Sequence, residues 1–260
     1  MPEACRRLTV VVPLYDEAAN VAALGHALTL FLSEEGATRV VDFVLVDDGS
    51  RDDTHARLQE LARALPAEVL RHAHNRGLTA ALDSGLRAAR GELIAWLDSD
   101  LTYPPSLLGE LARACDAGAD MALASCYHPQ GGVEGVPRWR LLVSRAASTG
   151  HRLTSGSRLH TFTSMVRVFR REVLDDCRPA RGGFVGVTEI LLRALRRGYR
   201  AVEVPAVLRR RRAGVSKMRV ARVALGHLGL MWANVTGRLC SSAPPRPASA
   251  KDQESSASDS

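Results

Sequence analysis

The chain has 260 residues, 46% of them hydrophobic, which is enough to bury one core of catalytic-domain size. Its five cysteines are widely spaced and form no Cys-x-x-Cys pair, which argues against a disulfide framework or zinc site and favours a reducing compartment. The net charge of +7 indicates anionic partners, but charge alone does not choose among nucleotides, nucleic acids, phospholipid surfaces and phosphorylated lipids.

Up to about residue 126, short apolar runs alternate with stretches that have helical spacing. Repeated strand–helix units of this kind predict an α/β fold with a mostly parallel sheet and helices on both faces. We expect strands over 8–13, 40–46, 67–72, 92–97 and 120–125, and helices over 17–34, 53–64, 78–90 and 104–118.

Acidic residues follow three of these apolar runs: Asp16-Glu17, Asp47-Asp48, and Asp98 with Asp100. In open α/β sheets, ligands bind at the carboxyl ends of the strands. Carboxylates gathered at that edge repel one another unless a cation or hydrogen-bond donors offset them. Each cluster alone is a common turn or helix-cap sequence. Three such strand ends together favour a site that holds a metal ion and a phosphorylated ligand.

The second half of the chain is less regular. It begins with a Gly-rich stretch, and its elements are shorter or more basic than those before residue 126. We expect a helix over 137–153, a strand over 165–170, a Gly-rich loop over 182–186, a helix over 187–198 and a strand over 200–205.

The segment 208–217 holds four arginines and Lys217, and is either an anion-binding loop or simply solvated. Residues 218–239 predict one more helix, whose interval without formal charge is too short to cross a bilayer. That helix either lies on a membrane, with Trp232 at the interface, or packs on its own domain. From residue 241 the composition is typical of a disordered tail. We therefore expect a catalytic domain over 1–217, an amphipathic helix over 218–240 and a tail over 241–260.

Four motifs resemble the nucleotide-sugar-binding half of family 2 glycosyltransferases. They are Val-Val-Pro-Leu-Tyr-Asp-Glu (11–17), Val-Asp-Asp-Gly-Ser-Arg-Asp-Asp-Thr (46–54), Asn-Arg-Gly-Leu-Thr-Ala-Ala-Leu (75–82) and Asp-Ser-Asp-Leu-Thr-Tyr-Pro-Pro (98–105). Later motifs, among them Gly-Gly-Val-Glu-Gly (131–135) and Arg-Arg-Ala-Gly-Val-Ser-Lys (211–217), resemble those of polyprenol-phosphate (dolichol-phosphate) mannosyltransferases. The resemblance covers roughly residues 8 to 230.

The resemblance implies a GT-A (Rossmann-like) fold and the inverting transfer of a hexose to a polyprenol or dolichol phosphate. The expected hexose is mannose, donated by GDP-mannose. The implied partners are the nucleotide sugar, the lipid acceptor, and the cytoplasmic membrane face or a membrane partner subunit, which makes the protein cytoplasmic and peripherally membrane-associated. No nucleic acid is implied.

The resemblance also implies a divalent cofactor, Mg²⁺ or Mn²⁺, and roles for individual residues. The metal would offset charge on the departing nucleotide as a Lewis acid. A phosphate acceptor is already anionic, so it needs to be positioned more than it needs a base to deprotonate it. Arginine side chains supply such positioning. The implied substrate-binding residues are Pro13, Tyr15, Glu17, Val46, Asp48, Asp98, Ser99, Asp100, Arg145, Arg211 and Lys217; Asp100, Arg145, Arg211 and Lys217 are catalytic, and Asp100 and Thr102 hold the metal.

Three positions depart from the subfamily pattern: Thr102 stands where Gln is usual, Cys126 where Arg is common, and Met165 where Gly is usual. They motivate an alternative in which the same donor site serves a soluble or saccharide acceptor, which would require a base. A second alternative is a nucleic-acid-binding module built on the basic segment 209–217. An aromatic content of 5% gives that alternative few stacking surfaces.

Overall fold

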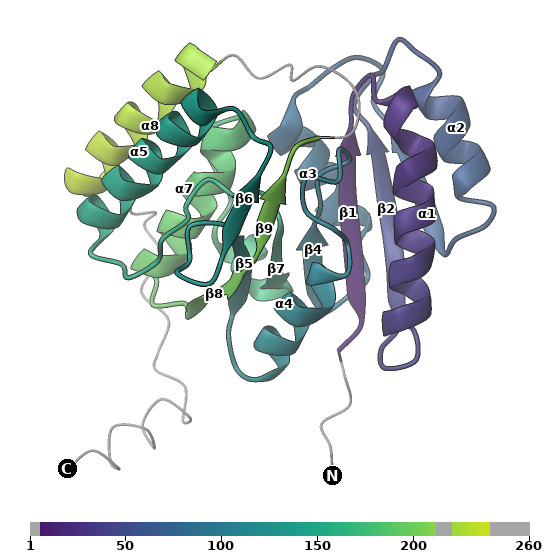
Figure 1. Cartoon of the computed structure of the whole chain (residues 1–260), viewed down its shortest axis with the longest axis horizontal. Helices are drawn as coiled ribbons and strands as arrows, with labels where there is room; N and C mark the ends of the chain where they lie inside the picture. The colour runs from purple at the N-terminus through teal and green to yellow at the C-terminus, as the bar shows by residue number, and fades with distance from the viewer. Residues whose placement is uncertain (1–5, 212–219, 240–260) are drawn as a thin grey trace.

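The computed structural model describes residues 6–211 and 220–239 (Figure 1). A seven-stranded sheet runs through the molecule in the order β3-β2-β1-β4-β7-β5-β8. Strand β7 is antiparallel to both neighbours, β4 and β5, and the other pairings in this sheet are parallel. The predicted α/β architecture is confirmed. Its strands are β1 (Leu8–Leu14), β2 (Val41–Asp47), β3 (Ala67–Arg71), β4 (Leu93–Trp96), β5 (Met121–Ser125), β7 (Arg167–Arg170) and β8 (Ala201–Pro205).

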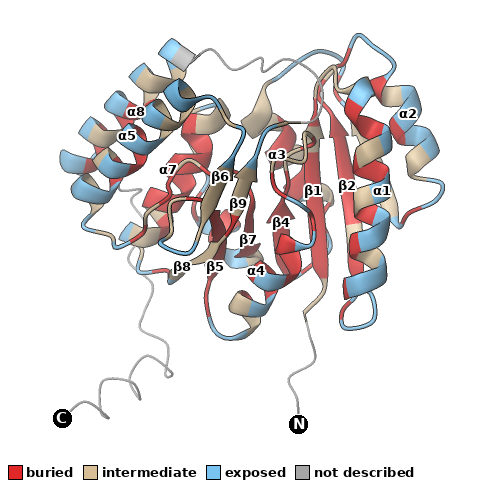
Figure 2. Cartoon of the chain, viewed as in Figure 1, coloured by how far each residue is buried: buried red, intermediate tan, exposed pale blue. Residues whose placement is uncertain are grey.

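Helices cover both faces of this sheet because its central strands are apolar on both sides (Figure 2). Successive side chains of a strand point to opposite faces, so Val10 and Val12 pack in one core layer and Val11 in the other. The first layer holds α1 (Ala18–Glu35), α2 (Thr54–Leu61) and α4 (Leu107–Asp116); the second holds α3 (Leu78–Ala88), α6 (Arg171–Asp176), α7 (Gly183–Arg196) and α8 (Val220–Val235).

Two short strands form a separate parallel pair that the sequence pattern did not predict. They are β6 (Gly132–Glu134) and β9 (Val207–Arg209), and they lie side by side in Figure 1. Part of the basic segment is therefore a strand rather than a loop. The predicted loop over 182–186 is wrong as well, because α7 begins at Gly183. Buried Val185 and Val187 give this stretch an apolar face from its first turn.

Helix α8 packs against α5 (Arg138–Ser155) and α7. His227, Leu230 and Ala233 face inward, and Nδ1 of His227 lies 3.0 Å from Nε2 of His151 on α5. Burial, with the neighbouring imidazole, lowers the pKa of His151 to about 3, and burial also lowers the pKa of His227. Both rings are therefore neutral at neutral pH. No helix in the described ranges is long and apolar enough to span a bilayer.

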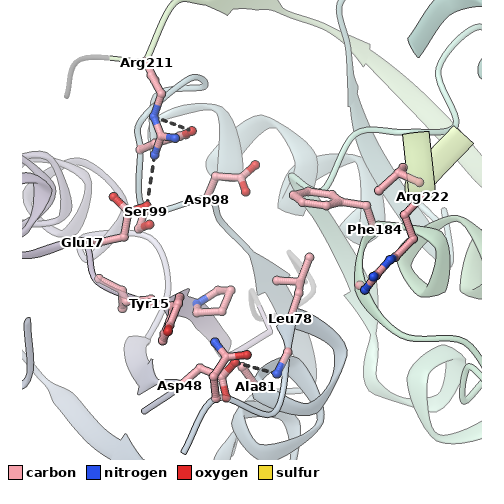
Figure 3. A pocket seen from close by; sticks show the side chains of 17 residues that line it. Tyr15, Glu17, Asp48, Leu78, Ala81, Asp98, Ser99, Phe184, Arg211 and Arg222 are labelled. Atoms are coloured by element: carbon pink, nitrogen blue, oxygen red, sulfur yellow. Dashed lines mark hydrogen bonds and ion pairs between the residues drawn. The ribbon is translucent and has the colours of Figure 1, made fainter. Parts of the chain in front are cut away.

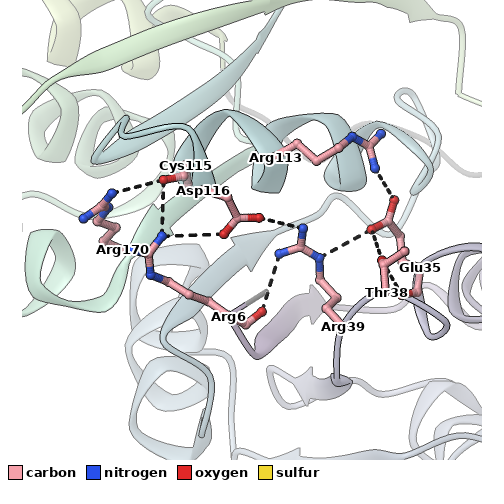
Figure 4. A network of polar contacts seen from close by, with 8 residues as sticks. All are labelled: Arg6, Glu35, Thr38, Arg39, Arg113, Cys115, Asp116 and Arg170. Carbon is pink, nitrogen blue, oxygen red and sulfur yellow. Dashed lines mark hydrogen bonds and ion pairs between the residues drawn. The ribbon is translucent and has the colours of Figure 1, made fainter. Parts of the chain in front are cut away.

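An ionic network centred on buried Arg39 and Glu35 ties α1 to α4 near the carboxyl end of each helix (Figure 4). Nη2 of Arg39 lies 2.8 Å from Oδ2 of Asp116, and its Nε lies 3.4 Å from Oε2 of Glu35. Arg113 completes the Glu35 carboxylate with Nη1 2.7 Å from Oε1. Because the Arg39 side chain is only 1% exposed, these carboxylates are needed to offset the cost of burying its charge.

Gly109 makes room for this network, since a Cβ there would lie 1.9 Å from Oε1 of Glu35. We expect Gly109→Ala to lower the free energy of unfolding by about 1–3 kcal/mol, because the added methyl must displace a carboxylate held by two arginines. The matched control is Gly229→Ala on α8, where a Cβ would have no atom within 4 Å, and this change should add about 0.5–1 kcal/mol. Urea unfolding of both variants measures the difference; equal effects would contradict the prediction.

Candidate active site

A cavity of about 540 Å³ opens at the carboxyl ends of β1, β2 and β4 (Figure 3). This is the edge at which the sequence placed its acidic clusters. The cavity is lined from the strand ends by Pro13, Leu14, Tyr15, Glu17, Asp48, Asp98, Ser99 and Asp100, and from elsewhere by Asn75, Gly77, Leu78, Ala81, Gly183, Phe184, Arg211, Arg222 and Val223.

The loop after β1 is held in a strained shape by the loop after β2. Asp16 has a φ of 47°, in the left-handed region that side chains other than glycine rarely adopt. Its backbone N–H donates to Oγ of Ser50 over 2.9 Å, and its carboxylate accepts from the backbone N–H of Arg51 over 2.8 Å. The next residue, Glu17, donates its N–H to Oγ1 of Thr54 over 2.8 Å. These bonds fix the direction in which Tyr15 and Glu17 enter the cavity.

Asp48 organises the third loop of the site. Its Oδ1 accepts from the backbone N–H of Arg76 over 2.9 Å, and its Oδ2 from that of Gly77 over 2.7 Å. The Nδ1 of His72 lies 2.7 Å from Oδ1, and Nε2 of the same ring lies 2.9 Å from Oγ of Ser84. Asp48, His72 and Ser84 are thus linked side chain to side chain as in an Asp–His–Ser catalytic triad, but Ser84 does not line the cavity. The arrangement positions the 75–77 loop.

Three carboxylates and one guanidinium form the acidic centre, which comprises Glu17, Asp98, Asp100 and Arg211 (Figure 3). Nη2 of Arg211 lies 3.1 Å from Oε1 of Glu17, and its Nε lies 3.7 Å from Oδ2 of Asp100. Desolvation by burial, together with the charges of Asp100 and Glu17, raises the pKa of Asp98 to about 8 although the charge of Arg211 lowers it. One guanidinium therefore does not offset the carboxylates around it.

The donor set of this centre fits Mg²⁺ or Mn²⁺ held mainly by a ligand's phosphates. Carboxylate oxygens are the ligands of hard divalent cations, and Mg²⁺ typically takes one or two of them together with substrate phosphates. Within residues 6–211 and 220–239, no three His, Cys, Asp or Glu side chains are grouped to hold an ion by themselves. Asp100, the carboxylate predicted for this role, lines the cavity beside Arg211. Thr102, the other predicted ligand, donates its backbone N–H to Oδ1 of Asp100 over 3.2 Å but does not line the cavity.

Of the predicted substrate-binding residues that the structure describes, eight lie together and two, Val46 and Arg145, lie apart from them. Val46 has a fully buried side chain in the core beneath α3, so a side-chain contact with a ligand is not supported. Arg145 is exposed on α5, with its guanidinium 5.1 Å from the centre of the Tyr127 ring, and lies outside the cavity lining. Lys217 falls outside the described residues. The eight that line the cavity are Pro13, Tyr15, Glu17, Asp48, Asp98, Ser99, Asp100 and Arg211.

No residue of the cavity wall opposite the strand ends was predicted individually to bind a ligand, although Leu78 and Ala81 belong to the 75–82 motif. Leu78 and Ala81 come from α3, Phe184 from the first turn of α7, and Arg222 and Val223 from α8. Phe184 lay in a stretch assigned to a loop, and the other four have the ordinary spacing of packed helices. The packing of three helices around the cavity identifies Phe184, Arg222 and Val223 as lining residues.

The sequence profile described as glycosyl transferase family 2 matches residues 9–178. The polyprenol monophosphomannose synthase of Mycolicibacterium smegmatis is 33% identical over 90% of this chain and 89% of its own length. The dolichol-phosphate mannosyltransferase of Pyrococcus furiosus is 30% identical to this chain. That match covers 82% of this chain and 59% of the relative's own length.

Among solved structures, glucosyl-3-phosphoglycerate synthase of Mycobacterium tuberculosis, in a complex with Mn²⁺, UDP and phosphoglyceric acid, superimposes with a TM-score of 0.65. The match covers 90% of this chain and 78% of that one at 19% identity, and so speaks for the fold alone. The fold is the predicted GT-A fold. Because the family profile covers more than half of the chain, and a relative aligns along nearly its whole length, the protein belongs to glycosyltransferase family 2.

Proposed function

We propose that the protein transfers mannose from GDP-mannose to a polyprenol phosphate, with inversion at the transferred carbon. The observation that carries this proposal is the acidic centre with Arg211, which lies in the same cavity as Tyr15 and Asp48. The cavity thus offers a site for a nucleoside beside a site for a diphosphate. The 33% identity to a polyprenol monophosphomannose synthase supports mannose and a lipid phosphate as substrates.

The residues divide the work by position in the cavity. Pro13, Tyr15 and Asp48 line the end proposed for the nucleoside, where Asp48 also fixes the 75–77 loop. A divalent cation, when bound at Asp100, supplies positive charge beside the departing diphosphate. Arg211 is already in this region and carries a fork of donors that matches phosphate oxygens. Transfer to a phosphate acceptor then depends on alignment, since that acceptor needs no base to become nucleophilic.

The protein is also proposed to bind the cytoplasmic face of a membrane through an apolar ridge on α5 and α8. In the described part of the chain, all large exposed hydrophobic side chains except Leu30 and Val40 lie on these two helices. Helix α5 adds four arginines and no acidic residue, which suits an anionic headgroup layer. The ridge comprises Trp139, Leu142, Leu153, Leu225, Leu228, Trp232 and Val235.

The first test is transfer of label from GDP-mannose to polyprenyl phosphate, followed by extraction into organic solvent. We expect the label to enter the organic phase when Mg²⁺ or Mn²⁺ is present and to stay aqueous when EDTA removes the metal. UDP-sugars, soluble saccharide acceptors and oligonucleotides serve as comparisons. Label in a water-soluble saccharide, or tighter binding to oligonucleotides than to GDP-mannose, would contradict the proposal.

A second test replaces Asp100 by Asn, which keeps an oxygen for the Thr102 backbone N–H but removes the charge. We expect kcat/KM to fall by roughly 10²–10³-fold, as when a charge-stabilising group is removed from an active site. Mn²⁺ should no longer tighten GDP binding, as measured by calorimetry. Asp83→Asn removes a carboxylate on α3 outside the cavity and is the matched control. Full Mn²⁺-dependent turnover by Asp100→Asn would exclude the metal role.

A third test uses vesicles of phosphatidylcholine and phosphatidylglycerol. We expect the wild type to float with them and the double variant Leu228→Asn, Trp232→Asn to lose most of this binding, because burial of each apolar side chain contributes about 1.5–3 kcal/mol. Leu30→Asn removes a half-exposed leucine from α1, away from the ridge, and should bind like the wild type. Unchanged flotation of the double variant would place the membrane-binding surface elsewhere.

A further inference from the structure

The cavity has a second end whose chemistry differs from that of the acidic centre. Leu78, Phe184 and Val223 line it, together with the guanidinium-bearing Arg222. Figure 3 shows Asp98 in the middle of the cavity, with Arg211 on one side and Phe184 and Arg222 on the other. This end, which we name the cationic-apolar end, thus combines one positive charge with apolar walls.

Arg222 and Arg211 differ in their ion-pair partners. Arg211 is paired with Glu17 and Asp100. Among the residues that the structure describes, no acidic side chain forms an ion pair with Arg222, although its position on α8 lets it line the cavity. An arginine at a cavity wall without a carboxylate partner is available to an anionic ligand, and its planar fork matches phosphate oxygens.

Arg222 also begins a row of exposed apolar side chains on α8. Leu225, Leu228, Trp232 and Val235 follow it at intervals of three or four residues, the spacing that places side chains on one helix face. All four are more than half exposed. A molecule with one anionic head and one long apolar chain fits this order of groups, with the head at Arg222 and the chain against the row.

We propose that the cationic-apolar end is the subsite for the lipid acceptor. The Arg222 guanidinium binds the phosphate of a polyprenyl phosphate, Phe184 and Val223 contact the first isoprene units, and the rest of the chain leaves along the exposed row of α8. This assignment rests on the proposed function. In the reaction, an acceptor phosphate oxygen bonds to the sugar's anomeric carbon while the bond from that carbon to the donor diphosphate breaks. The electron pair leaves with the nucleoside diphosphate.

The test compares full-length wild type with Arg222→Ala and Arg222→Lys in detergent solution. We expect Arg222→Ala to raise the KM for polyprenyl phosphate roughly 10- to 100-fold, the loss expected for a charge-assisted contact, while the dissociation constant of GDP-mannose stays within about twofold of wild type. Arg222→Lys should recover part of this loss. Arg238→Ala, which removes an exposed cation just beyond the other end of α8, is the matched control and should behave like wild type.

A binding measurement separates the phosphate from the chain. Wild type should bind polyprenyl phosphate more tightly than polyprenol or inorganic phosphate, and Arg222→Ala should remove the preference for polyprenyl phosphate over polyprenol. Phe184→Ala should weaken binding of both lipids and leave GDP-mannose binding unchanged. These two results would support both halves of the subsite.

The failures are distinguishable. If wild type transfers mannose to polyprenyl phosphate but Arg222→Ala has the acceptor KM of Arg238→Ala, the subsite is refuted and the proposed function stands. A loss of GDP-mannose affinity in Arg222→Ala would also refute it, because Arg222 would then act on the donor. If wild type transfers nothing to any polyprenyl phosphate, the proposed function itself has failed.

Discussion

Repulsion among carboxylates at one edge of the sheet is the constraint on which the active-site region depends. Glu17, Asp98 and Asp100 come from loops after two different strands. Burial raises the pKa of Asp98, and the charges of Asp100 and Glu17 add to this effect. Such groups separate unless the backbone prevents it or positive charge offsets it. Here the loops restrain the carboxylates, and Arg211 offsets part of their charge. Asp16 and Leu101, the two residues other than glycine with positive φ in the described ranges, lie in these loops. Their strain is tolerated because hydrogen bonds and the sheet determine the loop shapes.

The position of the Arg211 guanidinium depends in turn on the small β6–β9 strand pair. The backbone N–H of Arg210 donates to the carbonyl of Glu134 over 3.0 Å, and that of Arg209 donates to the carbonyl of Thr102 over 2.9 Å. These two bonds bring the end of β9 over the Asp98–Thr102 loop, so that Arg211 reaches Glu17 and Asp100. Thr102 therefore contributes through its backbone, whichever side chain it carries. Two strands of three residues each decide where the cation of the acidic centre lies.

The sequence predicted the strand ends well and the opposite wall of the cavity poorly, for a physical reason. Apolar runs such as Phe43–Val46 mark buried strands because they are short, uncharged and rich in β-branched or aromatic residues, and the acidic residues after them are then placed by topology. Phe184, Arg222 and Val223 reach the cavity through helix packing, which residue spacing does not encode. Strands β6 and β9 were too short to give a periodic signal. Val46 shows a further limit, because it belongs to a motif but the pleat turns its side chain into the core.

The contact between the His151 and His227 imidazoles makes the packing of α8 on α5 depend on pH. The pKa of His151 is about 3 in the folded protein against an ordinary value of 6.5, so the unfolded chain binds a proton more readily over this interval. The stabilising contribution of the neutral ring is complete above pH 6.5 and declines as the pH falls toward 3. His227 has the same sign, since burial lowers its pKa too. Protonation of these rings therefore opposes the packing of α8 on α5. Mild acid weakens this packing, which also positions Arg222 and the exposed leucines of α8.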